Sequence, residues 1–283
     1  MPTQTEKALL FQALHQRPDI FVVGNPWDAG TARILTSLGF VALSTTSAGL
    51  ANSLGRRDRT NTVSRDEGLR NARSIVEATP LPVAADLENG YGHSPETAAD
   101  TIRLAAETAG LVGGSIEDST GNREHPIYDF DHAVERIEAA VAAAHALPFP
   151  FMLVARTENY VYGRRDLDDT IRRLQAFEAA GADVLFAPGI TRTEDIQTVC
   201  ASVGKPVNVL VGLKGAPALS VSDLAALGVR RISLGCALTR TAMTAVIRGA
   251  REVLDHGTFS FATDAFSGSE LSNFFGAPEA SRQ

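Results

Sequence analysis

Short apolar runs recur along the chain and alternate with longer segments that mix apolar and polar residues. These runs are rich in β-branched residues and fall at 20–23, 41–44, 82–86, 114–118, 151–157, 184–188, 206–211 and 231–235. Runs of this length and composition predict β-strands, and the segments between them are long enough for helices. The pattern therefore predicts eight strands that alternate with helices along the whole chain.

Glycine and proline mark the boundaries of these elements. Glycine readily adopts the left-handed conformation that ends a helix, whereas proline cannot continue a helix but is tolerated at the start of a strand. Several alanine- or leucine-rich segments end on a glycine shortly before a strand, at Gly39, Gly110, Gly181 and Gly228. Other strands are entered through a proline, at Pro82, Pro150 and Pro206. These residues fix where the predicted helices end and the strands begin.

Nearly continuous apolar strands that alternate with helices are typical of a parallel sheet whose outer face is covered by helices. Eight such units close naturally into a (β/α)8 TIM barrel, so we expect an α/β fold of this kind. A doubly wound open sheet is the alternative. No Gly-x-Gly-x-x-Gly turn follows the first strand, which weakens a dinucleotide-binding interpretation.

We expect one catalytic barrel domain over residues 1–257, followed by a helical, aromatic C-terminal extension over 258–283. The extension holds more aromatic residues than a free terminus needs, namely Phe261, Phe266, Phe274 and Phe275. Exposed aromatic side chains favour docking on another surface. The extension is therefore expected to pack rather than to hang free.

The composition fits a globular protein with a substantial core. The 283 residues are 44% hydrophobic and 21% charged, with a formal net charge of -7. This balance argues against nucleic acid or an anionic membrane as a partner, because no basic cluster is available to neutralise phosphates. Cys200 and Cys236 form neither a disulfide framework nor a zinc motif. Since neither a signal peptide nor a membrane span is recognisable, we expect a cytoplasmic protein.

The stretch from Pro82 to Gly92 carries the strongest chemical signal. In such barrels the chemistry lies at the C-terminal ends of the strands. Here an apolar strand stops on two carboxylates, Asp86 and Glu88, followed by a glycine-rich turn. These carboxylates can share a hard cation such as Mg²⁺, which binds through one or two carboxylates and keeps several waters. A solvated loop entrance is the alternative, since these are also ordinary turn residues.

Polar residues follow the other strands as well. They are Asn25, Trp27, Asp28, Ser44 to Ser47, Glu117, Asp118, Arg156, Glu158 and Asn208. Acids on one side with an arginine opposite are what a metal-assisted reaction on a carboxylate substrate requires. The alternative is that Glu117 and Arg156 form a structural salt bridge, although ionic groups inside a barrel are costly and usually have a reason.

Six segments together resemble one known family. They read NPWDAG at 25–30, STTSAGL at 44–50, SLGRRD at 53–58, ADLENGYG at 85–92, IEDS at 116–119 and ARTE at 155–158. In this order they are similar to the isocitrate lyase/phosphoenolpyruvate mutase superfamily, and the resemblance extends from Asn25 to about Gly257. It implies a homodimer or homotetramer in which the C-terminal extension packs on, or exchanges with, a neighbouring subunit.

The resemblance also implies roles for individual residues. Mg²⁺, with Mn²⁺ as the alternative ion, would be bound directly by Asp86, while Asp58, Glu88 and Glu117 hold its waters. Arg156 would clamp a carboxylate of a small-molecule substrate. Further substrate contacts are expected from Thr45, Thr46, Ser47, Ala48 and Asn208. In the family the cation and the arginine stabilise an enolate oxygen, so that a bond to the carbon beside the carbonyl of a 2-oxo acid breaks or forms.

The loop after the fourth strand departs from the family pattern. Relatives that cleave isocitrate or methylisocitrate carry a cysteine there as acid/base, whereas this loop reads STGNREHPIY at 119–128. Because an imidazole in general exchanges protons near neutral pH, His125 joins Arg156, Glu117 and Asp58 as an expected catalytic residue, with a surface histidine as the alternative. Neither cysteine of the chain can be assumed to replace the missing thiol.

Two further departures concern the substrate. The sixth strand, LFAPG at 185–189, lacks the glutamate of tricarboxylate-cleaving relatives, and the Lys-x-Asn-Ser element of phosphonate-handling relatives is absent. We expect a Mg²⁺-dependent lyase that cleaves a C–C bond of a small 2-oxo or 2-hydroxy di-acid through an enolate. Oxaloacetate-, alkylmalate- and methylisocitrate-like acids are the candidate substrates. The alternatives are a phosphoenolpyruvate or phosphonopyruvate mutase or hydrolase, and a barrel that binds a 2-oxo acid without turnover.

Overall fold

Eight parallel strands form the centre of the computed structural model, which describes residues 1–60 and 62–276. They are β1 (Phe21–Val23), β2 (Leu43–Ser44), β3 (Val83–Asp86), β4 (Gly113–Glu117), β5 (Met152–Arg156), β6 (Val184–Phe186), β7 (Val207–Leu210) and β8 (Arg231–Ser233). Neighbours in the sheet follow sequence order, and β1 pairs with β8. A parallel bridge from Gly24 to Leu43 closes the sheet between β1 and β2. The predicted (β/α)8 TIM barrel is confirmed.

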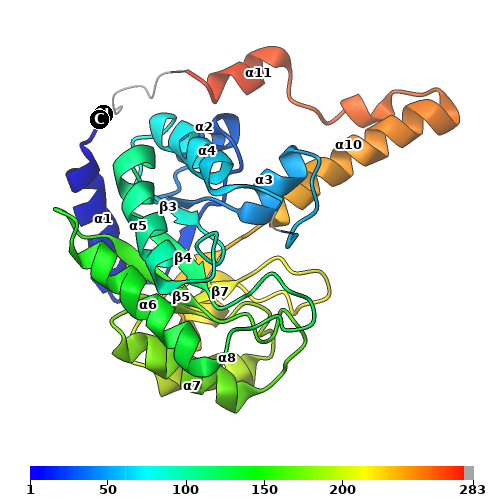
Figure 1. Cartoon of the computed structure of the whole chain (residues 1–283). Helices are drawn as coiled ribbons and strands as arrows, with labels where there is room; N and C mark the ends of the chain where they lie inside the picture. The colour runs from blue at the N-terminus through cyan, green and yellow to red at the C-terminus, as the bar shows by residue number, and fades with distance from the viewer. Residues whose placement is uncertain (61, 277–283) are drawn as a thin grey trace.

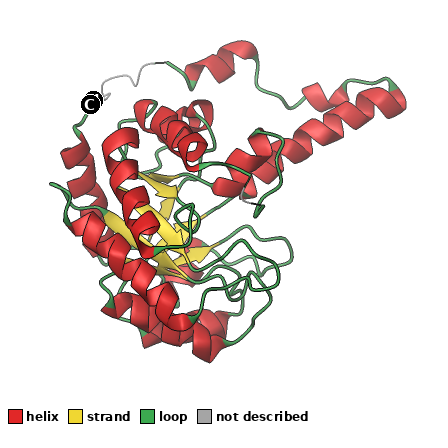
Figure 2. Ribbon diagram, in the orientation of Figure 1, coloured by secondary structure: helices red, strands yellow, loops and turns green. Residues whose placement is uncertain are grey.

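Most of the helices surround the strands, while the last helices of the chain extend away from them (Figures 1 and 2). They are α1 (Gln4–Gln16), α2 (Ala29–Ser37), α3 (Ser47–Ser53), α4 (Arg65–Glu77), α5 (Pro95–Ala109), α6 (Phe130–His145), α7 (Leu167–Ala179), α8 (Thr193–Ser202), α9 (Val221–Ala226), α10 (Ala237–His256), the 3-10 helix η1 (Ser260–Ala262) and α11 (Gly268–Asn273). None of these helices is long and apolar enough to pass through a membrane.

Local sequence signals place the helix ends. Ser94 accepts a hydrogen bond from the Thr97 N–H and precedes Pro95 in the first turn of α5. Gly110 ends the same helix in the left-handed conformation, with φ 72°. The other glycines predicted to follow helices also have positive φ, namely Gly39, Gly181 and Gly228. The predicted role of glycine at these boundaries is therefore confirmed.

Alternation along the strands separates an outer core from the barrel interior. Outward-facing residues such as Ile116, Leu153 and Ile232 belong to the large hydrophobic cluster that packs under the helices. Inside, Phe11 of α1 packs with Phe21 of β1 in a second cluster. The apolar side chains of α1 thus close the N-terminal end of the barrel interior.

Residues 237–266 form an arm that leaves the barrel (Figure 1). The arm consists of α10 and η1 with the residues that follow, and Gly257 ends α10 in the left-handed conformation. It exposes several large apolar side chains, namely Val246, Ile247, Leu254, Phe259, Phe261 and Phe266. Beyond the arm the chain returns to α2, where Arg33 donates to the carbonyl oxygen of Phe275 at 2.9 Å.

Candidate active site

A cavity of about 220 Å³ lies at the C-terminal ends of the strands. It is smaller than the roughly 300–1,000 Å³ typical of sites for drug-sized ligands, so it suits a small substrate. Most residues predicted to act on metal or substrate line this one cavity, namely Thr45, Thr46, Ser47, Ala48, Asp58, Asp86, Glu88, Glu117, Arg156 and Asn208. His125 is not among the lining residues.

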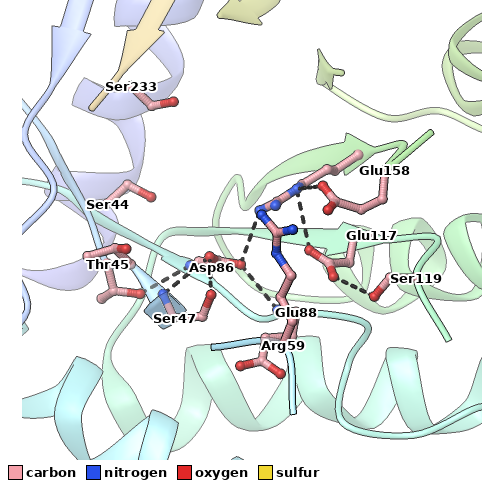
Figure 3. Close-up of polar contacts among 12 residues, drawn as sticks. Ser44, Thr45, Ser47, Arg59, Asp86, Glu88, Glu117, Ser119, Glu158 and Ser233 are labelled. Carbon is pink, nitrogen blue, oxygen red and sulfur yellow. Dashed lines mark hydrogen bonds and ion pairs between the residues drawn. The ribbon is translucent and has the colours of Figure 1, made fainter. Parts of the chain in front are cut away.

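Asp86, at the end of β3, is held by the segment that follows β2 (Figure 3). Its Oδ2 accepts hydrogen bonds from the Ser47 backbone N–H at 3.2 Å and from the Ser47 hydroxyl at 2.7 Å. The Asp86 backbone N–H donates to Oγ1 of Thr45 at 3.1 Å. The segment expected to contact substrate thus fixes the orientation of the carboxylate expected to bind the metal.

Arg156, at the end of β5, is surrounded by carboxylates. Its Nε lies 2.5 Å from Oε1 of Glu158 and 3.3 Å from Oε2 of Glu117, and its Nη1 lies 3.6 Å from Oδ1 of Asp86. Burial alone lowers the pKa of Arg156, but the negative charges of these three groups outweigh it and raise the pKa above its usual range. The salt bridge weighed from the sequence is present, and it lies inside the cavity.

Five carboxylates crowd this side of the cavity, and we call them the acidic wall: Asp58, Asp86, Glu88, Glu117 and Glu158. Burial, together with the charges of Asp86 and Asp58, raises the pKa of Glu88 to about 7. Burial also raises the pKa of Glu117, against the opposing charge of Arg156. Burial is the first cause of both shifts, and the five carboxylates have only Arg156 and Arg59 as ion-pair partners among the described residues, so a divalent cation would offset the remaining negative charge.

The acidic wall fits a hard divalent cation held largely through water. Mg²⁺ prefers oxygen ligands, keeps several waters and binds through one or two carboxylates. Within residues 1–60 and 62–276, no three His, Cys, Asp or Glu side chains already converge as a metal cluster. Glu88 has a left-handed backbone (φ 50°), and its N–H donates to Oδ1 of Asp86 at 3.3 Å. Such uncommon conformations cluster at functional sites.

Across the cavity, three inward-facing residues of β7 and β8 form what we call the polar wall: Asn208, Arg231 and Ser233. Asn208 Nδ2 donates to Oγ of Ser233 at 2.9 Å. Arg231 pairs with Asn208 in the register of the sheet and is only 4% exposed. Figure 3 shows Ser233 set apart from Asp86, Glu117 and Glu158. The two walls thus differ in both the sign and the number of their charges.

Sequence reasoning missed Arg231 and Ser233. Arg231 follows Arg230 at the start of an apolar run, and charged residues are rarely fully buried. The signal that was present is alternation, because Arg231 and Ser233 flank Ile232 and therefore share one face of the strand. Ile232 belongs to the outer core, so the shared face points into the barrel.

The loop between β4 and α6 leaves its histidine outside the cavity. His125 is exposed, whereas Ser119 of the same loop donates to Oε1 of Glu117 at 2.6 Å. Of the two cysteines, Cys236 lines the cavity. Cys200 lies on α8, where burial raises the pKa of its thiol to about 11 and so opposes formation of the thiolate. The acid/base role expected of His125 therefore finds no support in its position.

Known proteins with related sequences or structures fall in one group. The sequence model of the family described as phosphoenolpyruvate phosphomutase matches residues 11–254. A crystal structure of a candidate lyase/mutase from Burkholderia cenocepacia J2315 is 56% identical and covers 97% of each chain, with a TM-score of 0.93. Oxaloacetate acetylhydrolase in complex with the product oxalate is 26% identical, covers 98% of this chain and 96% of its own, and has a TM-score of 0.87. The oxaloacetate decarboxylase of Bradyrhizobium diazoefficiens is 29% identical over 88% of this chain and 85% of its own length.

Proposed function

The chain belongs to the phosphoenolpyruvate phosphomutase family, and from this premise we propose that it is a lyase that cleaves a C–C bond of a small 2-oxo or 2-hydroxy di-acid. Oxaloacetate-, alkylmalate- and methylisocitrate-like acids are the candidate substrates. The main observation behind this proposal is that the carboxylates of the acidic wall and Arg156 line the same small cavity. Relatives named for reactions of oxaloacetate support the same substrate class.

In this proposal the acidic wall holds Mg²⁺ or Mn²⁺. Asp86 would be the direct ligand, and Asp58, Glu88 and Glu117 would accept hydrogen bonds from waters around the ion. These residues fit the role because the five carboxylates of the wall have only two ion-pair partners among the described residues, Arg156 and Arg59. When bound, the ion polarises the carbonyl of the substrate and offsets negative charge that develops on its oxygen.

The residues of the chain then orient the substrate. Arg156 donates to a carboxylate of the substrate, and the carboxylates around the guanidinium keep it charged and fixed in place. The backbone N–H groups and small side chains of residues 45–48 border the same end of the substrate. For a 2-oxo di-acid such as oxaloacetate, the bond from the carbon beside the carbonyl to the distal carboxylate breaks, CO2 leaves, and the electron pair stays on an enolate that these donors stabilise. For a 2-hydroxy di-acid, a base of the cavity takes the hydroxyl proton as the bond from the hydroxyl-bearing carbon to its neighbour breaks, so that a 2-oxo acid leaves and the electron pair stays on the enolate of the second acid.

A proton must reach the enolate carbon to complete the reaction. His125 lies outside the cavity lining in this structure, and Cys200 lies on an outer helix. Cys236 and Tyr162 do line the cavity. Since burial raises the pKa of Tyr162, its hydroxyl remains protonated at neutral pH and is available as a donor, as is water.

The proposal is tested by incubating the purified protein with Mg²⁺ and a panel of 2-oxo and 2-hydroxy acids. Release of pyruvate, glyoxylate or another carboxylic acid from a di-acid supports the lyase. Phosphate release from phosphonopyruvate, or its interconversion with phosphoenolpyruvate, would instead support phosphorus–carbon chemistry. Binding of a 2-oxo acid without any product would support a barrel that has lost turnover.

We also propose that the protein is a homodimer or homotetramer whose arm packs on a second copy. The arm carries Leu254 and Phe259 at 83% and 68% exposure, and a lone chain would leave this apolar surface in water. Sedimentation equilibrium should report two or four copies, and Leu254→Lys should shift the distribution toward monomer. Arg251→Ala, on the same helix, is the control that should leave it unchanged. A monomeric wild-type protein would contradict the proposal.

A further inference from the structure

Arg231 is a buried cation that faces the cavity without a counterion. Its side chain lies in the barrel interior, and its guanidinium carbon is 5.9 Å from the ring centre of Phe11, which fills the N-terminal end. Neither Nε nor Nη1 has a hydrogen-bond partner among the residues that the structure describes. Burial lowers the pKa of Arg231 to about 10, and no neighbouring carboxylate opposes that effect.

The other arginines that line the cavity differ from Arg231 because each has an ion-pair or hydrogen-bond partner in the protein. Arg156 is paired with three carboxylates, and Arg59 lies 3.6 Å from Asp58. Arg240 is exposed and donates to the carbonyl oxygen of Gly212 at 2.6 Å. Arg231 therefore presents positive charge to the cavity that the protein itself does not neutralise.

The neighbours of Arg231 cannot supply the missing negative charge. His15 of α1 lies close by, and its Nδ1 pairs with the carbonyl oxygen of Phe11 at 2.8 Å. A carbonyl can only accept, so Nδ1 carries a proton, and burial followed by the charge of Arg231 lowers the pKa of His15 to about 3, which keeps the imidazole neutral at pH 7. Asn208 donates to Ser233, which leaves the hydroxyl hydrogen of Ser233 free to donate to a ligand. The polar wall thus offers two kinds of donor and no anion.

A buried charge without a partner is costly and marks a functional group that acts on a ligand. We propose that Arg231 and the Ser233 hydroxyl bind the second carboxylate of a di-acid substrate, across the cavity from the acidic wall. Asn208 is a positioning residue that orients Ser233. This inference rests on the proposed function, because the first carboxylate and the carbonyl are placed at the acidic wall.

Calorimetric titration of the full-length protein in Mg²⁺ buffer tests the inference with three acids. (S)-Malate and (S)-lactate share a 2-hydroxy carboxylate and differ in the distal carboxylate, while oxalate is short enough to report on the acidic wall alone. A charge-assisted contact to Arg231 predicts that the wild-type protein binds malate about tenfold to a hundredfold more tightly than lactate. If the wild-type protein binds malate and lactate with equal affinity, the inference is wrong, and no variant is needed to show it.

Arg231→Met should reduce the preference for malate to about twofold or less and leave oxalate affinity nearly unchanged. Arg230→Met is the matched control, because this neighbour is exposed and donates instead to the carbonyl oxygen of Pro18. It should keep the full preference. If Arg231→Met does not fold, Ser233→Ala should still lower the preference about threefold.

Two outcomes separate the failure of this inference from the failure of the proposed function. If oxalate binds with Mg²⁺ but Arg231→Met keeps the preference for malate, or weakens oxalate and malate equally, Arg231 is a structural charge and the inference is wrong. An inorganic anion or a water molecule held permanently beside Arg231 would give the same result. If oxalate does not bind in a Mg²⁺-dependent way, the proposed function itself fails.

Discussion

The two walls of the cavity differ in how their buried charges are paired. The acidic wall gathers five carboxylates around Arg156, so its charge is negative in sum and partly paired within the protein. The polar wall holds one arginine and two neutral side chains, and Arg231 has no ion-pair partner among the described residues. The acidic wall therefore holds more negative than positive groups, and the polar wall holds a positive group without an anion, which is the arrangement expected of a site for a metal ion and an acid.

The walls also differ in how the chain builds them. Four acids of the first wall come from the ends of β3, β4 and β5 and from the residues just after them, where a barrel presents its loops, and Asp58 comes from the segment between α3 and α4. Arg231 and Ser233 come from within β8, one residue on each side of Ile232. A ligand that reaches both walls must therefore extend from the loops into the barrel.

The largest effect is expected at Asp86. Asp86→Ala removes the carboxylate proposed as the direct metal ligand, so Mg²⁺-dependent turnover should fall by about 10³-fold or more. Chelation by EDTA should abolish turnover of the wild-type protein, and added Mg²⁺ or Mn²⁺ should restore it. Asp100→Ala on α5, where the carboxylate is exposed, is the control and should behave as wild type. Full activity of Asp86→Ala would place the ion elsewhere.

Removing an arginine should have opposite consequences at the two walls. Arg156→Met leaves Glu117 and Glu158 without their counterion, and we expect the free energy of unfolding to fall by about 3–5 kcal/mol. Arg231→Met removes a charge that lacks a partner, so the same quantity should stay level or rise by about 1 kcal/mol. Urea denaturation of both variants without metal makes the comparison. If both variants lose the same free energy of unfolding, the charge of Arg231 must be neutralised by a contact that the structure does not show.

The residues of the acidic wall could be predicted from the sequence more readily than those of the polar wall. Asp86, Glu88 and Glu117 were predictable because carboxylates at the ends of apolar strands converge once the strands are parallel. Arg231 was not, since its position inside the barrel depends on the closure of β1 on β8, a contact between distant parts of the chain. His125 lies on a loop whose path depends on tertiary contacts rather than on periodicity. All eight strands followed from local pattern alone, with boundaries that moved by no more than two residues.

The stability of the protein is expected to depend on pH through His15, which lies near Arg231. Burial, followed by the charge of Arg231, lowers the pKa of His15 from 6.5 to about 3 in the folded protein. Below pH 6.5 the unfolded chain therefore binds a proton that the folded chain does not, and stability falls as the pH is lowered toward 3. The free energy of unfolding should drop by about 2 kcal/mol between pH 7 and pH 5 from this residue.

Denaturation of His15→Gln at the two pH values checks this effect. The variant should lose that part of the pH dependence, whatever its stability at pH 7. His256→Gln, at the exposed end of α10, should retain the wild-type dependence. If His15→Gln retains it too, the imidazole is not held neutral beside Arg231.

The smallest effect is expected from a single neutral donor at the acidic wall. Ser119→Ala removes the hydrogen bond from the Ser119 hydroxyl to Glu117, so kcat/KM should fall about threefold to tenfold. Thr120→Ala on the same loop is a matched control, because its hydroxyl bonds to the carbonyl oxygen of His125 and not to the acidic wall. A loss at Ser119 as large as that at Asp86 would mean that the serine itself contacts the reacting atoms.

The central claim is that the acidic wall holds a divalent cation through Asp86. Anomalous diffraction from crystals soaked in Mn²⁺ tests it most directly. The account predicts one strong peak at about 2.0–2.2 Å from a carboxylate oxygen of Asp86, with Glu88 and Glu117 reached through water. A peak at another set of residues, or no peak in the cavity at saturating Mn²⁺, would contradict the account.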